Sequence, residues 1–383
     1  MADRDVDYLI VGGGVAGAAC AETLRAGDPA ASILLVGREP DAPYERPPAS
    51  KGYLRGEQGR EDALLHAATW WEDQRIELLT RVSAMKLDTD ARTVKLSDKQ
   101  EVGYRAALLA TGANVRRLRV PGAELEGIHY LRALANADAI RAGAETAERV
   151  VLIGGSYIAC EVAASLTVLG KRCTLVMQEA APLSSGFGET AGRFFQEEME
   201  RHGIAFLGGD AVQAFAAGPE QDEDDEDARV GLVRTASGRE LPADLVVLGT
   251  GAVPDVMLAR RAGLELGETG GVRCDSALRT SAANVWAAGD VCEYDSVVHG
   301  RRLRVEHWEV AREQGRTAAR GMLELNASGH IIQPCKPTRL AIFIYTVHRP
   351  LATAHAHARP HNRLRSAALR RAPGTRLRLM ARF

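Results

Sequence analysis

The order of apolar and polar positions repeats in two parts of the chain. In the first part, the apolar run at residues 8–11 leads into a glycine-rich turn, a segment at 18–25 that suits a helix, and a second apolar run at 32–36. Short apolar runs bounded by turn residues predict buried strands. The pattern therefore predicts strand, turn, helix and strand, the unit from which a parallel α/β sheet is built.

The turn of this first unit has glycine at all three positions of the G-x-G-x-x-G dinucleotide fingerprint. Its sequence is Gly12-Gly13-Gly14-Val15-Ala16-Gly17. The fingerprint needs a tight bend at its first glycine, close approach of a pyrophosphate at its second, and helix–strand packing at its third. The strand that follows ends in Gly37-Arg38-Glu39, where Glu39 can accept a hydrogen bond from a ribose hydroxyl. A glycine-rich turn without a ligand is the alternative, but this context favours a dinucleotide site.

The second part repeats the pattern less completely. An apolar run at 149–153 leads into Gly154-Gly155-Ser156-Tyr157-Ile158-Ala159, a helix at 161–169 and a strand at 173–177. Ser156 replaces the second glycine and narrows the approach to a phosphate, so weaker binding is expected. Glu179 is the candidate ribose acid, although Met177 and Gln178 lie nearer the strand, and the lack of an arginine there favours NAD over NADP. A repeated scaffold unit that binds nothing remains the alternative.

Composition narrows the class of protein. The 383 residues include 48 Lys and Arg against 50 Asp and Glu, a net charge of −2, which excludes attraction to nucleic acid or membrane through bulk charge. The length predicts roughly two or three domains. No apolar run reaches the roughly 20 residues of a membrane helix, and residues 1–5 do not form a signal peptide, so a cytoplasmic protein is expected.

The cysteines argue against thiol and metal chemistry. No two of them form a C-x-x-C or other close pair, so no metal site is expected, and Cys160 and Cys173 are expected to be buried apolar residues. Two dinucleotide units without a thiol pair indicate a flavin that receives hydride from a nicotinamide. The six are Cys20, Cys160, Cys173, Cys274, Cys292 and Cys335.

Residues 43–51, Pro-Tyr-Glu-Arg-Pro-Pro-Ala-Ser-Lys, match the P-Y-x-R-P-P-L-S-K motif of a known family with one replacement, at Ala49. Further matches are Ala110-Thr111-Gly112, Leu131-Arg132, Gly249-Thr250-Gly251 with Pro254, Ala288-Gly289-Asp290, and Val305-Glu306-His307-Trp308 before a helix at 311–323. From residue 8 to about 348 the chain thus resembles the flavoprotein reductases with two dinucleotide sites. Within them it is similar to the NADH:ferredoxin reductases of bacterial oxygenase systems and to relatives of apoptosis-inducing factor.

The resemblance implies an α/β fold of the glutathione-reductase type, in three layers, with two Rossmann-like domains. The FAD-binding domain would span residues 1–117 and 247–325, and the NAD(P)-binding domain residues 118–246. An incomplete or atypical α+β domain would occupy residues 326–383. The cofactors implied are FAD and NADH, with NADPH less favoured, and the protein would be a monomer or homodimer.

The resemblance also assigns site residues. Lys51 and Glu161 match a buried catalytic Lys–Glu pair beside the flavin, for which an ordinary ion pair is the alternative. Tyr157 matches an aromatic residue that covers the flavin where nicotinamide enters, or else belongs to the core. Some relatives have an acid at the place of Arg38, so either Arg38 or Glu39 would face the ribose. The FAD contacts would be Gly12, Gly13, Gly14, Val15, Ala16, Gly17, Arg38, Glu39, Arg46, Lys51, Ala84, Thr111, Gly112, Arg132, Asp290, His307 and Trp308. The NAD contacts would be Gly154, Gly155, Ser156, Tyr157, Ile158, Glu161, Glu179, Gly251 and Glu306.

The function implied is an FAD-dependent NAD(P)H oxidoreductase of the ferredoxin–NAD(+) reductase type. The disulfide reductases of this superfamily carry a cysteine pair where residues 44–54 lie, and this stretch has none. The electron acceptor would therefore be a ferredoxin or rubredoxin. The alternatives are an NADH-responsive switch similar to apoptosis-inducing factor, and a paralogue impaired by Ser156 and an altered end.

Two segments depart from the pattern. The acidic run at 220–227 lies between strand-like residues 211–215 and 230–233, so it is expected to form a solvated hairpin tip rather than a calcium site. After Glu324 the chain has no acid, and arginines accumulate from Arg349 onward. We interpret this end as the product of a frameshift or replacement. A basic arm for nucleic acid is the less favoured alternative, because Phe383 is its only aromatic residue.

Overall fold

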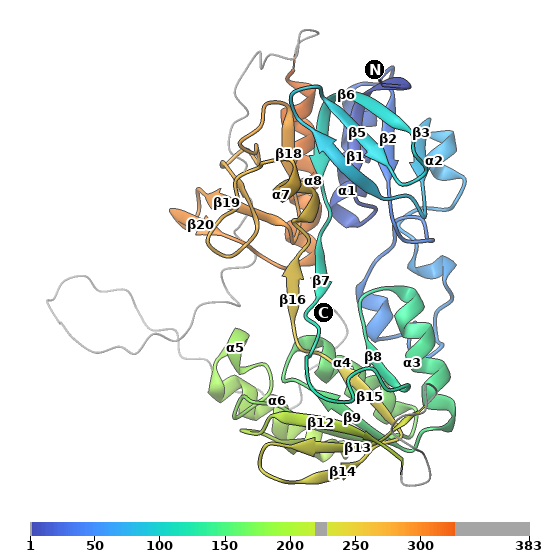
Figure 1. Cartoon of the computed structure of the whole chain (residues 1–383), viewed down its shortest axis with the longest axis vertical. Helices are drawn as coiled ribbons and strands as arrows, with labels where there is room; N and C mark the ends of the chain where they lie inside the picture. The colour runs from blue at the N-terminus through green and yellow to red at the C-terminus, as the bar shows by residue number, and fades with distance from the viewer. Residues whose placement is uncertain (1, 219–227, 326–383) are drawn as a thin grey trace, which may run out of the picture. The chain divides into compact units, whose positions relative to one another are not determined.

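A seven-stranded sheet is built from the N-terminal part of the chain and one later strand. The computed structural model describes residues 2–218 and 228–325. The strand order is β3-β2-β1-β6-β5-β4, and β18 pairs with β6 (Figure 1). Strands β1, β2, β3, β6 and β18 run parallel, whereas β4 and β5 form antiparallel pairs. Their bounds are β1 Arg4–Val11, β2 Ile33–Val36, β3 Ile76–Leu79, β4 Ala84–Asp88, β5 Thr93–Leu96, β6 Glu101–Leu109 and β18 Val285–Ala287.

Two helices pack against each other beside this sheet. They are α1 (Val15–Gly27) and α8 (Trp308–Leu323), the first and last helices of the described residues. A Cβ added at Gly315 of α8 would lie 2.1 Å from the carbonyl oxygen of Ala16 in α1. Glycine therefore permits the two helix backbones to touch, which brings the start of α1 next to α8.

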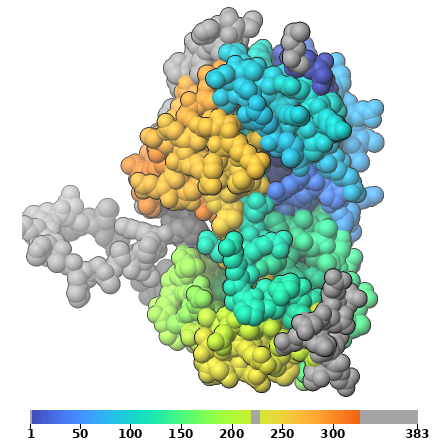
Figure 2. Space-filling model, in the orientation of Figure 1, coloured from blue at the N-terminus to red at the C-terminus, as the bar shows by residue number. Residues whose placement is uncertain are grey.

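A five-stranded parallel sheet forms the second unit, in three layers. Its order is β11-β10-β9-β15-β8. In β9, Val150 and Leu152 face α3 and α4, whereas Val151 and Ile153 face a small antiparallel sheet of β12, β13 and β14. That small sheet lies at the outer surface, at the bottom of the view in Figures 1 and 2. The bounds are β8 Ile128–Tyr130, α3 Leu134–Thr146, β9 Arg149–Ile153, α4 Tyr157–Val168, β10 Arg172–Val176, α5 Ser184–Phe187, α6 Glu189–Arg201, β11 Ala205–Leu207, β12 Val212–Ala217, β13 Val230–Thr235, β14 Glu240–Pro242 and β15 Leu245–Leu248.

A two-stranded ribbon joins the two sheets. β7 (Ala113–Val115) leads from β6 toward β8, and β16 (Ala252–Pro254) leads back from β15, the two running antiparallel. Hydrogen bonds extend the ribbon at both ends, from Arg116 N to Gly251 O and from Asp255 N to Gly112 O, each 2.9 Å. The remaining elements are η1 Pro47–Ser50, η2 Glu61–Ala63, α2 Trp70–Asp73, α7 Met257–Arg261, β17 Val272–Cys274, β19 Cys292–Ser296 and β20 Arg301–Leu303.

The segment between β2 and β3 does not stay with the first sheet. Tyr44, Tyr53 and Leu54 are buried in one apolar cluster with Leu134 of α3 and Val162 of α4. The segment thus begins and ends in the first sheet but contributes to the core of the second. The contacts of the described residues do not divide them into separate domains, and the domain limits at 117/118 and 246/247 stay predictions.

The repeated pattern is confirmed, with small shifts at the ends of elements. The first helix begins at Val15 instead of 18, the second at Tyr157 instead of 161, and the last at Trp308 instead of 311, because each starts directly after the residue that caps it. Strands β12 and β13 form the expected antiparallel hairpin. The acidic run at its tip and the chain after residue 325, with the predicted third domain and its arginines, lie outside the described residues.

Asp244 illustrates how side chains hold the second sheet. It precedes β15, and its carboxylate accepts hydrogen bonds from the Arg149 guanidinium and from the backbone N–H groups of Arg149 (2.8 Å) and Glu148 (3.1 Å). The Arg149 hydrogen bond outweighs burial and, with the backbone donors, lowers the pKa of Asp244 to about 2. The ionised form is therefore favoured in the folded protein.

We predict that Asp244→Asn lowers the free energy of unfolding at pH 7 by about 1 kcal/mol, since the carboxylate is partly exposed. The contribution of Asp244 is complete above its ordinary pKa and is lost as the pH falls toward about 2, so the difference from wild type closes over that interval. Urea unfolding at a series of pH values measures it. Asp90→Asn, in an exposed turn, serves as the control and should change neither the free energy of unfolding nor its dependence on pH. A difference that is independent of pH would contradict the assignment.

Candidate functional site

The three fingerprint glycines of the first turn are needed for two different reasons. A Cβ at Gly12 would lie 2.1 Å from Ala110 O, and one at Gly17 would lie 2.0 Å from Gly12 O, so the protein's own packing requires both glycines. A Cβ at Gly14 would meet nothing within 4 Å. Gly14 is the residue directly before α1, whose first N–H groups have no partner within the helix. The open space at this helix start fits a pyrophosphate, as the sequence predicts.

The second glycine turn has the same bend and a different helix cap. Gly154 has φ +108°, and a Cβ there would lie 2.5 Å from Gly249 O, which parallels Gly12 in the first unit. Ser156 is the N-cap of α4 and accepts a hydrogen bond from Ala159 N. Its hydroxyl donates to Gly249 O at 2.8 Å. Ser156 therefore satisfies groups of the protein itself, and its effect on phosphate binding stays a prediction.

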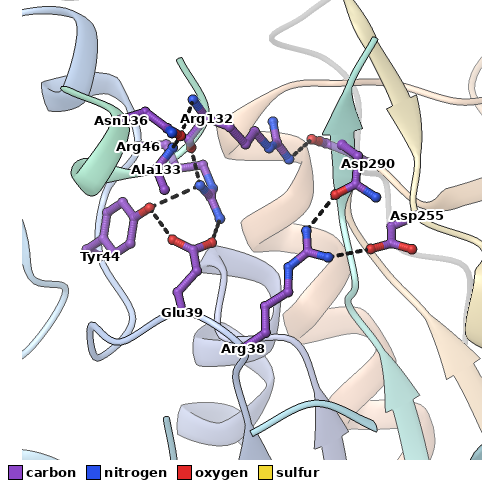
Figure 3. Close-up of polar contacts among 10 residues, drawn as sticks. Arg38, Glu39, Tyr44, Arg46, Arg132, Ala133, Asn136, Asp255 and Asp290 are labelled. Atoms are coloured by element: carbon purple, nitrogen blue, oxygen red, sulfur yellow. Dashed lines mark hydrogen bonds and ion pairs between the residues drawn. The ribbon is translucent and has the colours of Figure 1, made fainter. Parts of the chain in front are cut away.

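Arg38 and Glu39, which follow β2, point to different partners (Figure 3). Glu39 accepts hydrogen bonds from the Tyr44 hydroxyl and from Arg46, each at 2.5 Å. Burial opposes ionisation of Glu39, but the charge of Arg46 and these hydrogen bonds outweigh it and lower the pKa of Glu39. Arg38 instead donates to Asn114 at 2.6 Å and to Asp255 at 2.9 Å. Both side chains are engaged within the protein, and which of them faces a ribose stays a prediction.

Arg46 connects this pair to other predicted FAD residues. It donates to the backbone carbonyl of Arg132, and the Arg132 guanidinium donates to Asp290 at 3.1 Å (Figure 3). A Cβ at Gly112 would lie 3.4 Å from the same guanidinium. The structure thus gathers Glu39, Arg46, Gly112, Arg132 and Asp290, which come from distant parts of the sequence.

Sequence reasoning missed several residues of this group. Tyr44 stands in the quoted motif without a role, and its hydroxyl binds Glu39. Asn136 accepts hydrogen bonds from the backbone N–H groups of Arg132 (3.2 Å) and Ala133 (2.9 Å) and so fixes the turn before α3. Asp255 holds Arg38, and its own carbonyl accepts a hydrogen bond from Thr111. Nothing in the local sequence of Asp255 signals its contacts, because Arg38 and Thr111 are distant in the chain. Asn136 is a local contact at the third position of α3, which a search for helix caps could have found.

The predicted catalytic pair is formed. Lys51 Nζ lies 2.6 Å from Glu161 Oε2, joining the end of η1 to α4. The pair is half-buried, with side chains 31% and 29% exposed. Lys51 follows η1 and Glu161 lies in the first turns of α4, so their side chains meet at the edge of the packed core.

Two residues beside the second turn have the exposure that a nucleotide contact requires. Tyr157, the first residue of α4, is 45% exposed and packs edge-to-face on Phe187, so it is not a core residue. Glu179 is exposed, and its Oε2 would lie 3.3 Å from a Cβ at Gly155. Met177, which is nearer the strand, is buried and points its sulfur toward the same glycine. The acid nearest the turn is therefore Glu179.

The other predicted contacts are found in ordinary local roles. Ala84 lies in β4 opposite Leu96, whereas Val82 is the residue whose N–H reaches Gly37 O at the end of β2, so the Ala84 contact stays a prediction. Glu306 pairs with Arg304 at 2.5 Å. His307 caps α8, which Trp308 begins. Gly13, Val15, Ala16 and Ile158 belong to the two turns and helix starts, and Gly251 to the ribbon.

The described cysteines are all buried, and none forms a disulfide. Burial raises the pKa of Cys160 to about 12 and that of Cys173 to about 11, which makes both unreactive as thiolates. Within residues 2–218 and 228–325, no three His, Cys, Asp or Glu side chains gather as metal ligands. No helix in the same ranges is long and apolar enough to cross a membrane.

Comparisons with known proteins show which family the chain is similar to. A family model described as pyridine nucleotide-disulphide oxidoreductase matches residues 6–315. The chain is 33% identical to a ferredoxin–NAD(P)(+) reductase of Sphingomonas sp, over 87% of this chain and 78% of that protein. It is 35% identical to the ferredoxin–NAD(+) reductase component of an anthranilate 1,2-dioxygenase system from Burkholderia cepacia, over 82% and 75%.

A solved structure extends the comparison to the fold. The covalent putidaredoxin reductase–putidaredoxin complex matches with a TM-score of 0.77 and 32% identity, covering 84% of this chain and 76% of the chain compared. The expected α/β fold with parallel sheets, of the glutathione-reductase type, is confirmed.

We predict that Gly14→Ala and Gly12→Ala separate binding from folding. Gly14→Ala should lower the free energy of unfolding of the FAD-free protein by no more than about 1 kcal/mol, since alanine is a poorer N-cap than glycine but its Cβ meets nothing. It should weaken FAD binding by roughly tenfold or more, because the methyl group occupies the space at the helix start. Gly12→Ala should destabilise the protein itself. Fluorescence titration of the FAD-free variants with FAD checks the binding. Wild-type affinity in Gly14→Ala would show that the pyrophosphate binds elsewhere.

Proposed function

The chain belongs to the pyridine nucleotide-disulphide oxidoreductase family, and we propose that it passes electrons from NADH through bound FAD to a one-electron iron–sulfur carrier. The observation that supports this most is the Lys51–Glu161 pair, which joins the motif segment that follows the first dinucleotide unit to the helix that starts at the second glycine turn. Two dinucleotide units linked by a charged pair suit transfer from one bound ring to another.

The first unit has the features needed to hold FAD. The start of α1 offers unpaired N–H groups and open space at Gly14 for a pyrophosphate. Arg46 and Arg132 lie near each other and add guanidinium donors that Glu39 and Asp290 already orient. When bound, FAD supplies a ring that takes up two electrons as hydride and releases them singly. The protein's part is to bind and orient the cofactor.

The second unit would hold NADH. Glu179 lies beside the second glycine turn, where a carboxylate accepts from the ribose 2′-hydroxyl of NADH and repels the 2′-phosphate of NADPH. The related Burkholderia protein is named for NAD(+), whereas the Sphingomonas protein is named for NAD(P)(+). The exposed carboxylate of Glu179 supports NADH as the preferred donor.

Lys51 and Tyr157 would act where the two ligands meet. The ammonium of Lys51 places a positive charge that stabilises the negative charge gained with a hydride, and Glu161 holds that ammonium in place. Tyr157 stands exposed at the start of α4, suited to shield the reacting rings until nicotinamide arrives. No side chain needs to act as an acid or base in the hydride transfer itself.

The proposed acceptor is an iron–sulfur protein of the ferredoxin or rubredoxin type. The described thiols are buried, which disfavours a disulfide substrate. Two relatives are named ferredoxin reductases, and the similar solved structure is a complex of a reductase with putidaredoxin. These names favour electron transfer over the NADH-responsive switch. Cytoplasmic location and the oligomeric state stay predictions.

We predict that NADH reduces the FAD-loaded protein within seconds and that NADPH does so at least about tenfold more slowly. The reason is the carboxylate of Glu179 beside the second turn. An anaerobic titration that follows flavin absorbance measures both. Equal rates would remove the preference for NADH, and a flavin that neither nucleotide reduces would contradict the proposed function.

Replacing the ribose acid should change the choice of nucleotide. We predict that Glu179→Gln reduces the NADH/NADPH ratio of kcat/KM roughly tenfold, equivalent to about 1.4 kcal/mol, mostly through KM, because the variant no longer repels the 2′-phosphate. Glu197→Gln, which removes an exposed carboxylate from α6, is the matched control and should leave the ratio unchanged. An unchanged ratio in Glu179→Gln would assign the ribose contact to another residue.

A further inference from the structure

The Lys51–Glu161 pair is held by more than its own attraction. Both side chains are long and nearly one-third exposed, and exposed ion pairs contribute little and are not fixed by charge alone. Yet the two charged atoms lie 2.6 Å apart, on elements from different parts of the chain. The contacts of the neighbouring residues show what fixes them.

Ser50, the residue before Lys51, binds the same carboxylate. Its hydroxyl donates to Glu161 Oε2 at 2.5 Å, the oxygen that also faces Lys51 Nζ. Ser50 is 2% exposed, in contrast to the pair itself. One oxygen of Glu161 therefore contacts two consecutive residues, the buried Ser50 and the partly exposed Lys51.

Ser165 completes the contact from the next turn of the same helix. Its hydroxyl donates to the backbone carbonyl of Ser50 at 2.7 Å, and Ser165 is also 2% exposed. Residues four apart lie on one face of a helix. Glu161 thus binds the hydroxyl of Ser50, and Ser165 binds its backbone carbonyl.

The surroundings make these two hydrogen bonds specific. Ala49, Leu54, Val162 and Leu166 are buried in the apolar cluster that holds this region. A polar group left without a partner there costs more free energy than the bond itself contributes, so alternative positions of Ser50 are disfavoured. The hydrogen bonds fix the place of the segment relative to α4.

We propose that Ser50 and Ser165 form a serine clamp, a pair of positioning residues that sets the geometry of Lys51 and Glu161 for flavin reduction. The inference rests on the proposed function for its catalytic consequence, and on the contacts above for the clamp itself. The clamp acts through Glu161, which Ser50 contacts directly and Ser165 contacts through Ser50.

The kinetic test compares Ser50→Ala and Ser165→Ala with Ser296→Ala, which removes another buried serine hydroxyl, in β19. In anaerobic stopped-flow experiments the limiting rate of FAD reduction by NADH should fall roughly tenfold in the two clamp variants, while the Kd for NADH and for FAD stays within about twofold. Ser296→Ala should match wild type. In a Glu161→Gln background, Ser50→Ala should change the rate by less than about twofold, because its effect passes through Glu161.

A second readout needs no turnover. Acetylation of Lys51, followed by peptide mass spectrometry on the folded FAD-free protein, should be several-fold faster in Ser50→Ala and Ser165→Ala, because a loosened Glu161 frees the ammonium. Lys86, whose side chain is 71% exposed, is the internal reference and should be unchanged. If Ser50→Ala does not fold by circular dichroism, Ser165→Ala carries both tests.

The outcomes distinguish the two proposals. Wild-type flavin that NADH does not reduce would contradict the proposed function, and Lys51 acetylation would still decide the clamp. Acetylation that stays at the wild-type rate in the clamp variants would overturn the clamp. Faster acetylation with an unchanged reduction rate, or an equal loss of rate in the Glu161→Gln background, would overturn its positioning role.

Discussion

The site depends on one contact: the segment between β2 and β3 is buried in the core of the second sheet. Tyr53 and Leu54 pack with α3 and α4, although the chain on either side of them belongs to the first sheet. At the edge of this core the segment presents Arg46 to Arg132 and Lys51 to Glu161. Burial of apolar surface supplies the free energy of this contact. The packed core then fixes the positions of the polar residues at its edge.

The sequence predicted well what local physics determines. Both glycine turns and the strand–turn–helix–strand order were predictable because a Cβ at Gly12 or Gly154 collides with the carbonyl of the residue that follows a neighbouring strand, whichever ligand is bound. The hairpin of β12 and β13 was predictable because two strand-like runs lie on either side of a short acidic run. Helix starts were displaced by three or four residues, because the periodic pattern of apolar side chains does not by itself locate the N-cap residue, such as Ser156 before α4.

Contacts between distant residues were predictable only where the motif resemblance supplied them. The Lys51–Glu161 pair came from the resemblance, but its exposure did not, because exposure depends on how the segment meets α4. Arg38 binds Asn114 in β7 and Asp255 after β16, and no local sequence pattern predicts these two contacts. The same holds for the hydrogen bond from the Ser50 hydroxyl to Glu161. Such contacts arise when tertiary packing brings two surfaces together, and spacing along one chain does not encode them.

The charges of the site are balanced before any ligand arrives. Four cations are matched by four acids in the pairs Arg38–Asp255, Arg46–Glu39, Lys51–Glu161 and Arg132–Asp290. A pyrophosphate entering this site therefore meets no surplus of positive charge, and attraction over distance is weak. Its binding must come from short, directed contacts: the unpaired N–H groups at the start of α1 and guanidinium groups already oriented by their acids. Short contacts demand close approach of the backbone, which is why the open space at Gly14 matters more to this site than its net charge.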